Sequence, residues 1–153
     1  MGKPNKQRLV RAALRARTRA VAPYSHFKVG AALLTRRGEI IGGANVESAS
    51  YGLTCCAERV ALFKALTEGR TDFIALAVVA RLEGGAMPCG ACRQLLAEYA
   101  PLATVWVADS RHPERVREFS VAALLPGAFV EFDTSQPPSA TSKRKGGKAC
   151  IGA

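Results

Sequence analysis

The sequence has no long hydrophobic run. Its longest uninterrupted apolar stretch, Phe73–Ala80, has eight residues, whereas a helix that crosses a bilayer needs about 20. The basic N-terminal segment is not followed by the apolar stretch that is typical of a secretory signal. We therefore predict neither a membrane span nor export, and we expect the protein in the cytoplasm.

Acidic residues are absent from both ends of the chain. Residues 1–20 contain seven Lys or Arg, and residues 143–148 contain four, with no Asp or Glu in either segment. The rest of the chain holds 11 basic side chains against all 12 acidic ones, so the net charge of +10 belongs to the ends. A near-neutral body argues against a broad surface for nucleic acid.

The chain also lacks an even number of cysteines: it has five. An odd number without a secretory signal argues against the disulfide framework of a secreted domain. Cysteines that cluster in a reducing compartment more often bind a metal ion or take part in catalysis. We interpret Cys55 as a buried core thiol, with an exchange for Cys56 as a metal ligand as the alternative. We give Cys150, near the end of the chain, no role.

The pattern of apolar residues predicts strands that alternate with helices. Helices are expected at residues 5–20, 55–68, 90–99 and 121–125, and strands at residues 29–35, 39–44, 73–80, 104–108 and, at an edge, 115–119. This alternation is typical of an α/β domain with helices on both faces of the sheet. After Asp133 the composition changes to Ser, Pro, Gly and Lys, so residues 134–153 are predicted to be a disordered basic tail.

The N-terminal helix, residues 5–20, has two interpretations. Apolar residues recur at helical spacing on one side, and arginines form the opposite stripe. The stripe fits a solvated helix face, whereas its arginine-rich, acid-free character also fits a mitochondrial transit peptide. We favour the solvated face, because the same segment supplies the first helix of the domain.

Three thiols have the spacing of a metal site. Cys89 and Cys92 belong to a Pro-Cys-Gly-Ala-Cys motif, and Cys56 lies 33 residues before Cys89. A C-x-x-C loop that enters a helix points its sulfurs at backbone amides and at the positive end of the helix dipole, which favours thiolates. Three thiolates are one ligand short of a closed structural zinc site, so water can take the fourth position.

Glu58 completes a catalytic pattern. It lies two residues after Cys56 in the first turn of a helix, where its carboxylate could reach a metal-bound water as general base. The order C-x-E…P-C-x-x-C is the three-cysteine form of the zinc deaminase signature. A redox pair, half of a structural zinc site, or a glutamate that only stabilises the helix dipole would explain single parts of this pattern. The ordered combination favours catalysis.

Five segments of the chain resemble the small homotetrameric cytidine deaminases. They are residues 24–32, 43–52, 56–59, 88–94 and 124–129, all in the same order. The resemblance implies a three-layer α/β/α fold with a mixed sheet of about five strands, and a catalytic domain over residues 1–133. It also implies zinc-dependent hydrolysis of cytidine and 2′-deoxycytidine to uridine and 2′-deoxyuridine with release of ammonia. The expected assembly is a homotetramer with shared active sites.

The resemblance also implies a role for each matching residue. It gives one Zn²⁺ per chain the ligands Cys56, Cys89 and Cys92, and it makes Glu58 the proton shuttle. The implied substrate contacts are Phe27 against the pyrimidine, Asn45 and Glu47 on the ribose, the Ala57 backbone near the base, and Phe129 closing the site of a neighbouring subunit. Arg59 is expected to donate a hydrogen bond to a thiolate ligand.

Simpler interpretations exist for the residues outside the zinc motif. Asn45 and Glu47 lie at alternate positions, so they face the same way in an extended segment, but both could instead cap a loop. Phe27 could be a core residue, Arg59 a surface arginine, and the segment at residues 124–129 could pack on its own chain.

Two other functions compete with nucleoside deamination. A polynucleotide-editing deaminase needs a groove that follows a nucleic-acid strand, which the near-neutral body does not favour, and an antibiotic-nucleoside deaminase is the related alternative. A zinc-stabilised binding module would use the basic ends on nucleic acid, but it would not need Glu58 or an open fourth ligand position.

Overall fold

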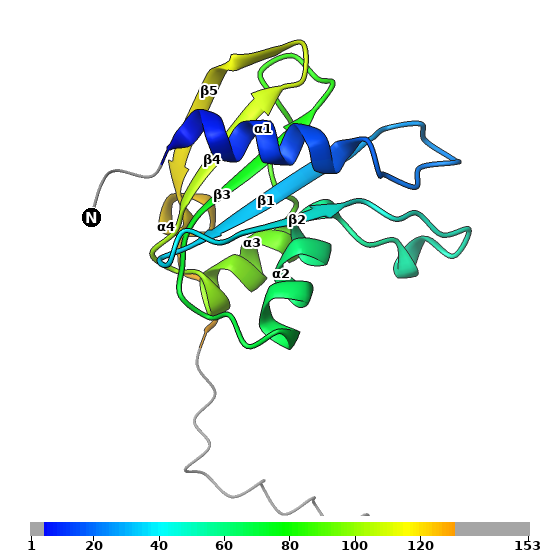
Figure 1. Cartoon of the computed structure of the whole chain (residues 1–153). Helices are drawn as coiled ribbons and strands as arrows, with labels where there is room; N and C mark the ends of the chain where they lie inside the picture. The colour runs from blue at the N-terminus through cyan, green and yellow to red at the C-terminus, as the bar shows by residue number, and fades with distance from the viewer. Residues whose placement is uncertain (1–4, 131–153) are drawn as a thin grey trace, which may run out of the picture.

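The computed structural model describes residues 5–130 (Figure 1). Its elements, in chain order, are α1 (Lys6–Arg17), β1 (Val29–Thr35), β2 (Ile40–Ala44), the 3₁₀ helix η1 (Tyr51–Leu53), α2 (Ala57–Thr67), β3 (Phe73–Ala80), α3 (Gly90–Tyr99), β4 (Thr104–Asp109), β5 (His112–Ser120) and α4 (Val121–Leu124). The expected disordered tail at residues 134–153 lies outside the described residues.

The strands form one mixed sheet in the order β2-β1-β3-β4-β5. The β3–β4 pair is parallel, and the other neighbours are antiparallel. Helix α1 covers one face of the sheet, while α2 and α3 cover the other (Figure 1). The three-layer fold expected from the sequence is therefore confirmed.

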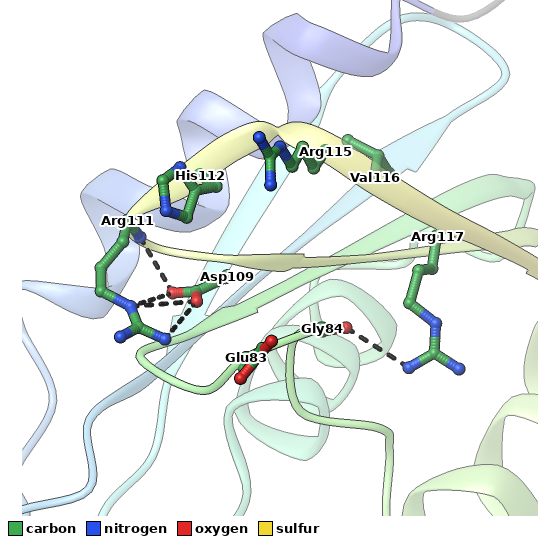
Figure 2. A pocket seen from close by; sticks show the side chains of 8 residues that line it. All are labelled: Glu83, Gly84, Asp109, Arg111, His112, Arg115, Val116 and Arg117. Carbon is green, nitrogen blue, oxygen red and sulfur yellow. Dashed lines mark hydrogen bonds and ion pairs between the residues drawn. The ribbon is translucent and has the colours of Figure 1, made fainter.

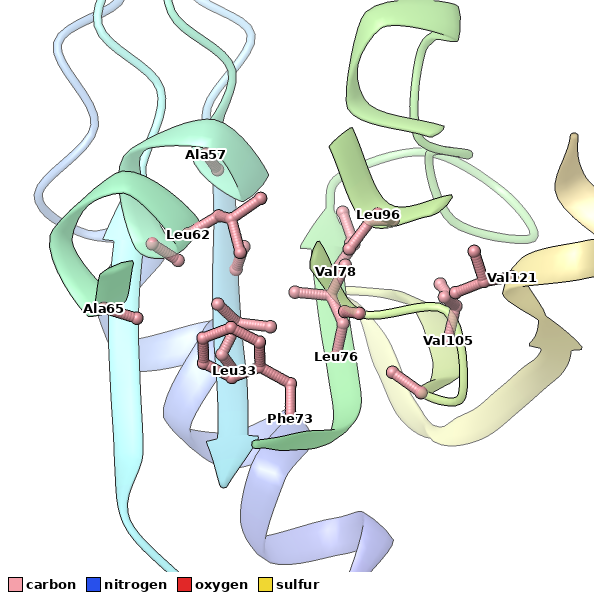
Figure 3. Packing of buried hydrophobic residues seen from close by; sticks show 14 of the residues in the cluster. Leu33, Ala57, Leu62, Ala65, Phe73, Leu76, Val78, Leu96, Val105 and Val121 are labelled. Atoms are coloured by element: carbon pink, nitrogen blue, oxygen red, sulfur yellow. The ribbon is translucent and has the colours of Figure 1, made fainter. Parts of the chain in front are cut away.

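Two apolar clusters fill the space between the sheet and its helices. On one side, Leu9 and Val10 of α1 pack among small and aromatic residues of β1, β3 and β4. On the other side, Leu62 of α2 points towards Leu33 of β1, and Leu96 of α3 lies against Val78 of β3 (Figure 3). Strand β3 is buried on both sides, as its uninterrupted apolar sequence predicted.

Helix α1 begins as predicted and ends early. The Asn5 side chain caps it by accepting a hydrogen bond from the Arg8 backbone at 3.0 Å. The helix stops at Arg17 instead of residue 20, because the chain turns there and Val21 then pairs with the Asn45 carbonyl. Its buried face packs on the sheet, so this segment does form the first helix of the domain.

The edge strand β5 is longer than the predicted residues 115–119. It pairs with β4 from His112 to Ser120, and its exposed side chains include those of Glu114, Arg115, Arg117 and Glu118. Charged residues on an edge strand disfavour pairing with a further strand. Within residues 5–130, no helix is both long and apolar enough to cross a membrane.

Gly43 on β2 lets helix α2 lie directly on the sheet. A Cβ atom at this position would lie 2.4 Å from the Ala61 nitrogen and 2.5 Å from the Ala57 oxygen, both in the α2 backbone. No side chain fits in that space. The position of α2, and with it the positions of the residues at its N-terminus, therefore depends on this glycine.

We expect Gly43→Ala to lower the free energy of unfolding by about 1–3 kcal/mol, because the added methyl group pushes α2 from the sheet. Gly42→Ala is the matched control, since a Cβ there meets only ordinary contacts from 3.4 Å upward. Urea denaturation followed by circular dichroism measures both variants. Equal stability of the two would contradict the close approach.

Candidate active site

Two helix N-termini bring three thiols together. Cys56 is the N-cap of α2, Cys89 is the N-cap of α3, and Cys92 lies in the first turn of α3. The Sγ atoms lie within 4.8 Å of one another, with 3.7 Å between Cys56 and Cys89 and 3.5 Å between Cys89 and Cys92. Zinc–sulfur bonds of about 2.3 Å in a tetrahedron require sulfurs about 3.8 Å apart. The cluster therefore fits a zinc ion.

The negative charge of the thiol cluster is concentrated on Cys56. Hydrogen bonds from Cys92 and Cys89, with help from Arg59, lower the pKa of Cys56 to about 5. The pKa of Cys92 is raised, because its thiol is a donor to Cys56 and is buried. A cation bound among the three sulfurs would remove the reason for Cys92 to keep its proton.

Glu58 lies in a cavity beside these thiols. Its side chain is 6% exposed, and burial raises its pKa to about 7. The cavity has a volume of about 210 Å³, and its walls are formed by Phe27, Val29, Asn45, Thr54, Cys56, Ala57, Glu58, Val78, Ala86, Met87 and Cys89. A carboxyl group with a pKa near neutrality can both accept and return a proton.

Three of the predicted substrate contacts, Phe27, Asn45 and Ala57, line this same cavity. Glu47 lies next to it, in a hollow of about 380 Å³ that it shares with Tyr24, Ser25, Ser48, Tyr51 and Thr54. Thr54 lines both spaces, so they adjoin. Phe129 lies outside both spaces, on the surface, where its carbonyl accepts a hydrogen bond from Gln94.

Asn45 holds the segment that carries Phe27. Its Oδ1 accepts a hydrogen bond from the Val29 backbone at 2.8 Å, and its Nδ2 donates one to the Phe27 carbonyl at 2.9 Å. The buried amide is thus satisfied on both of its sides by one short stretch of backbone. Sequence reasoning named loop capping as the alternative role of Asn45, and these contacts are of that kind.

Glu47 holds the preceding residues in the same way. Its carboxylate accepts hydrogen bonds from the Tyr24 backbone at 2.9 Å, from the Ser25 backbone at 3.2 Å, and from the Ser25 hydroxyl. The Ser25 hydroxyl is the main reason that the pKa of Glu47 is lowered. The carboxylate therefore stays ionised at the edge of the hollow, where it can accept further hydrogen bonds.

Arg59 lies beside the thiol cluster. Its Nη2 donates to the Thr54 carbonyl at 2.6 Å and approaches Cys56 Sγ at 4.0 Å. Among the described residues, no partner accepts a hydrogen bond from its buried Nε. The guanidinium thus links the chain before α2 to the Cys56 sulfur.

Sequence reasoning missed a second arginine that supports the site. Arg93 Nε donates to the Pro88 carbonyl at 2.7 Å, and Arg93 Nη1 donates to the Leu124 carbonyl at 3.2 Å. Arg93 therefore links Pro88, the residue just before Cys89, to Leu124 at the end of α4. Its place directly after Cys92 is a local signal, but the partner 31 residues away is not visible in the sequence.

The prediction for Cys55 was wrong. Cys55 is half-buried and does not belong to the apolar core. Its backbone pairs with Val46 in an isolated bridge, with bonds of 2.8 and 2.9 Å, which holds it outside helix α2. Burial raises the pKa of its thiol, and the thiol cluster consists of Cys56, Cys89 and Cys92.

The comparison with known families agrees with this geometry. Residues 3–108 match the model of the cytidine and deoxycytidylate deaminase zinc-binding region. The chain belongs to this family. It is therefore a hydrolytic deaminase with a zinc-binding region, and its clustered cysteines are placed to bind one metal ion.

Individual relatives cover most of the chain. Cytidine deaminase of Halalkalibacterium halodurans is 51% identical over 129 residues, which is 84% of this chain and 97% of that protein. Cytidine deaminase of Sporosarcina psychrophila is 46% identical over 129 residues, 84% of this chain and 94% of that protein. The crystal structure of cytidine deaminase from Burkholderia pseudomallei has 50% identity and a TM-score of 0.76, and covers 80% of this chain and 97% of that one.

We expect the purified protein to carry one zinc ion per chain and Cys89→Ala to lose most of it, because two thiolates cannot hold the ion as three do. Cys55→Ala removes a neighbouring thiol that lies outside the cluster and should keep the ion. Inductively coupled plasma mass spectrometry measures zinc per chain. Equal zinc loss in both variants would contradict the assigned ligand set.

Proposed function

We propose that this protein hydrolyses cytidine and 2′-deoxycytidine to uridine and 2′-deoxyuridine with release of ammonia. One observation carries the proposal: a buried carboxyl group, Glu58, shares a cavity of about 210 Å³ with two of three clustered thiols. The match to cytidine deaminases over nearly their whole length supports the choice of substrate.

The proposal assigns one zinc ion per chain to Cys56, Cys89 and Cys92. The spacing of their sulfurs and the two helix N-termini behind them support this assignment. When bound, zinc supplies a Lewis acid that activates water for attack on the ring carbon bearing the amine. A thiol cluster that must stay reduced fits a cytoplasmic location.

Glu58 moves the protons in the proposed reaction. Its carboxylate accepts a proton from the attacking water, gives it to N3 of the ring, and later helps to protonate the departing amine. A pKa of about 7 suits this exchange, since neither the ionised nor the neutral form is strongly disfavoured near pH 7. Burial in the cavity keeps bulk water away from the carboxyl group.

The two adjoining spaces suit the two halves of a nucleoside. We place the pyrimidine in the smaller cavity, with Phe27 against its face and the Ala57 backbone at its edge. The ribose then extends past Asn45 towards the hollow beside Glu47, whose ionised carboxylate accepts a bond from the 3′-hydroxyl. Because both substrates have a 3′-hydroxyl, this placement admits cytidine and 2′-deoxycytidine.

We expect Glu58→Gln to keep its fold and its zinc but to lower kcat by about 10²- to 10⁴-fold, because the amide cannot carry protons. Glu68→Gln, at the exposed C-terminal end of α2, is the matched control and should remain active. The fall in absorbance as cytidine becomes uridine measures turnover. Near-normal activity of Glu58→Gln would remove this residue from the mechanism.

We further propose a homotetramer in which Phe129 closes the active site of a neighbouring subunit. Large apolar side chains are exposed around the hollow, Tyr51 at 84% and Tyr24 beside it, and Phe129 is 61% exposed elsewhere on the chain. Exposed aromatic groups of this size are typical of surfaces that another molecule covers. A second copy of the chain would cover them and enclose the substrate.

We expect light scattering to give the mass of a homotetramer, and Phe129→Ala to raise KM more than it lowers kcat, because part of the proposed pocket is lost. Leu102→Ala is the control, as Leu102 is an exposed apolar residue outside the hollow and the cavity. A monomer that is fully active at assay concentration would refute both the shared site and the role of Phe129.

A further inference from the structure

A second large hollow lies at the turn between β4 and β5. It has a volume of about 550 Å³ and is lined by Glu83, Gly84, Asp109, Arg111, His112, Arg115, Val116 and Arg117 (Figure 2). The lining residues come from the loop after β3 on one side and from the β4–β5 hairpin on the other. None of them lines the cavity of Glu58, so this hollow is a separate space.

One carboxylate of this hollow, that of Asp109, already has a cationic partner. The Arg111 guanidinium donates two hydrogen bonds to Asp109 Oδ2, at 2.6 Å from Nη2 and at 3.0 Å from Nε. Asp109 itself is only 5% exposed. The hydrogen bonds to Asp109 are the main reason that the pKa of Arg111 is raised, and Glu83 adds to the effect. Asp109 is therefore paired with Arg111, whereas Glu83 contributes only a longer-range attraction to the same arginine.

Arg115 and Arg117 have no comparable partner. They lie at alternate positions of β5, so they face the same side of the strand. Within residues 5–130, no carboxylate lies within ion-pair distance of Arg117, which donates a 3.4 Å hydrogen bond to the Gly84 carbonyl. Arg115 meets only Glu114, at 3.8 Å, and exposed pairs of this kind contribute little. Two guanidinium groups thus keep free donors at the hollow.

The wall opposite these arginines is fixed by two glycines. Gly84 and Gly85 have φ angles of 72° and 78°, which other residues rarely adopt. A Cβ on Gly85 would lie 2.6 Å from the Val107 side chain and 2.8 Å from the Ala108 nitrogen, so the loop rests directly on β4. Together with the Arg111–Asp109 pair, this close packing fixes the wall of the hollow that lies opposite Arg115 and Arg117.

We propose that this hollow binds a small molecule bearing a phosphate group. The guanidinium groups of Arg115 and Arg117 donate hydrogen bonds to the phosphate oxygens, a geometry that the planar fork of arginine matches. The volume is within the range of sites for small ligands, so the group that carries the phosphate also has room. The inference does not depend on the proposed reaction, because this hollow shares no lining residue with the Glu58 cavity or with the hollow beside Glu47.

Isothermal titration calorimetry of the full zinc-loaded chain with inorganic phosphate, at constant ionic strength, tests the proposal. We expect one saturable site per chain, and a Kd at least about tenfold higher in the double variant Arg115→Gln/Arg117→Gln. Arg8→Gln/Arg11→Gln, on the exposed face of α1, removes the same charge elsewhere and should leave the Kd unchanged. Absence of a saturable site in the parent, or equal weakening in both double variants, would overturn the proposal.

Two further measurements sharpen this test. Arg117→Lys keeps the charge but loses the planar guanidinium group, so it should weaken phosphate binding. This single variant keeps the test open if the double variant fails to fold. An unchanged Kd would count against the site. Adenosine 5′-monophosphate distinguishes the sources of the phosphate. Tighter binding than inorganic phosphate indicates a nucleotide, and equal binding indicates the phosphate group alone. Adenosine that binds as well as its monophosphate would exclude phosphate recognition.

Discussion

The meeting of two helix N-termini at one edge of the sheet is the constraint on which the rest of the site depends. Because β3 and β4 are parallel, α3 must cross over between them, and it starts near the end of β3. Helix α2 reaches the same edge because Gly43 lets it lie flat on β2. Only then can the two N-cap residues, Cys56 and Cys89, bring their sulfurs within 3.7 Å.

The same arrangement explains why a carboxyl group is buried beside the thiols. Ala57 and Ala61 on α2 pack on the sheet, and this packing turns Glu58, one position after Ala57, into the cavity. Burial disfavours the charged carboxylate, and the neighbouring thiolate adds to that effect. A fold that buries this residue therefore also gives it the proton affinity that acid–base chemistry near neutral pH requires.

Local signals were enough to predict the strands, the helices and the motif that brings Cys56, Glu58, Cys89 and Cys92 to one place. Apolar runs and short motif spacings are properties of neighbouring residues, so β3 and the pair Cys56 and Glu58 could be inferred directly. The bonds of Asn45 to the segment at residues 27–29, and of Arg93 to Leu124, join residues 16 to 31 positions apart. Such contacts depend on the tertiary fold, and Cys55 was misjudged for the same reason.

The loop between β3 and α3 separates the arginine-lined hollow from the Glu58 cavity. Its first part, with Glu83 and Gly84, forms the wall of the arginine-lined hollow, whereas Ala86 and Met87 form a wall of the Glu58 cavity. The loop then enters Cys89, where Arg93 holds the Pro88 carbonyl. Gly85, which lies between these two parts of the loop, is packed against β4. Because no residue lines both the arginine-lined hollow and the Glu58 cavity, the two spaces can be occupied at the same time.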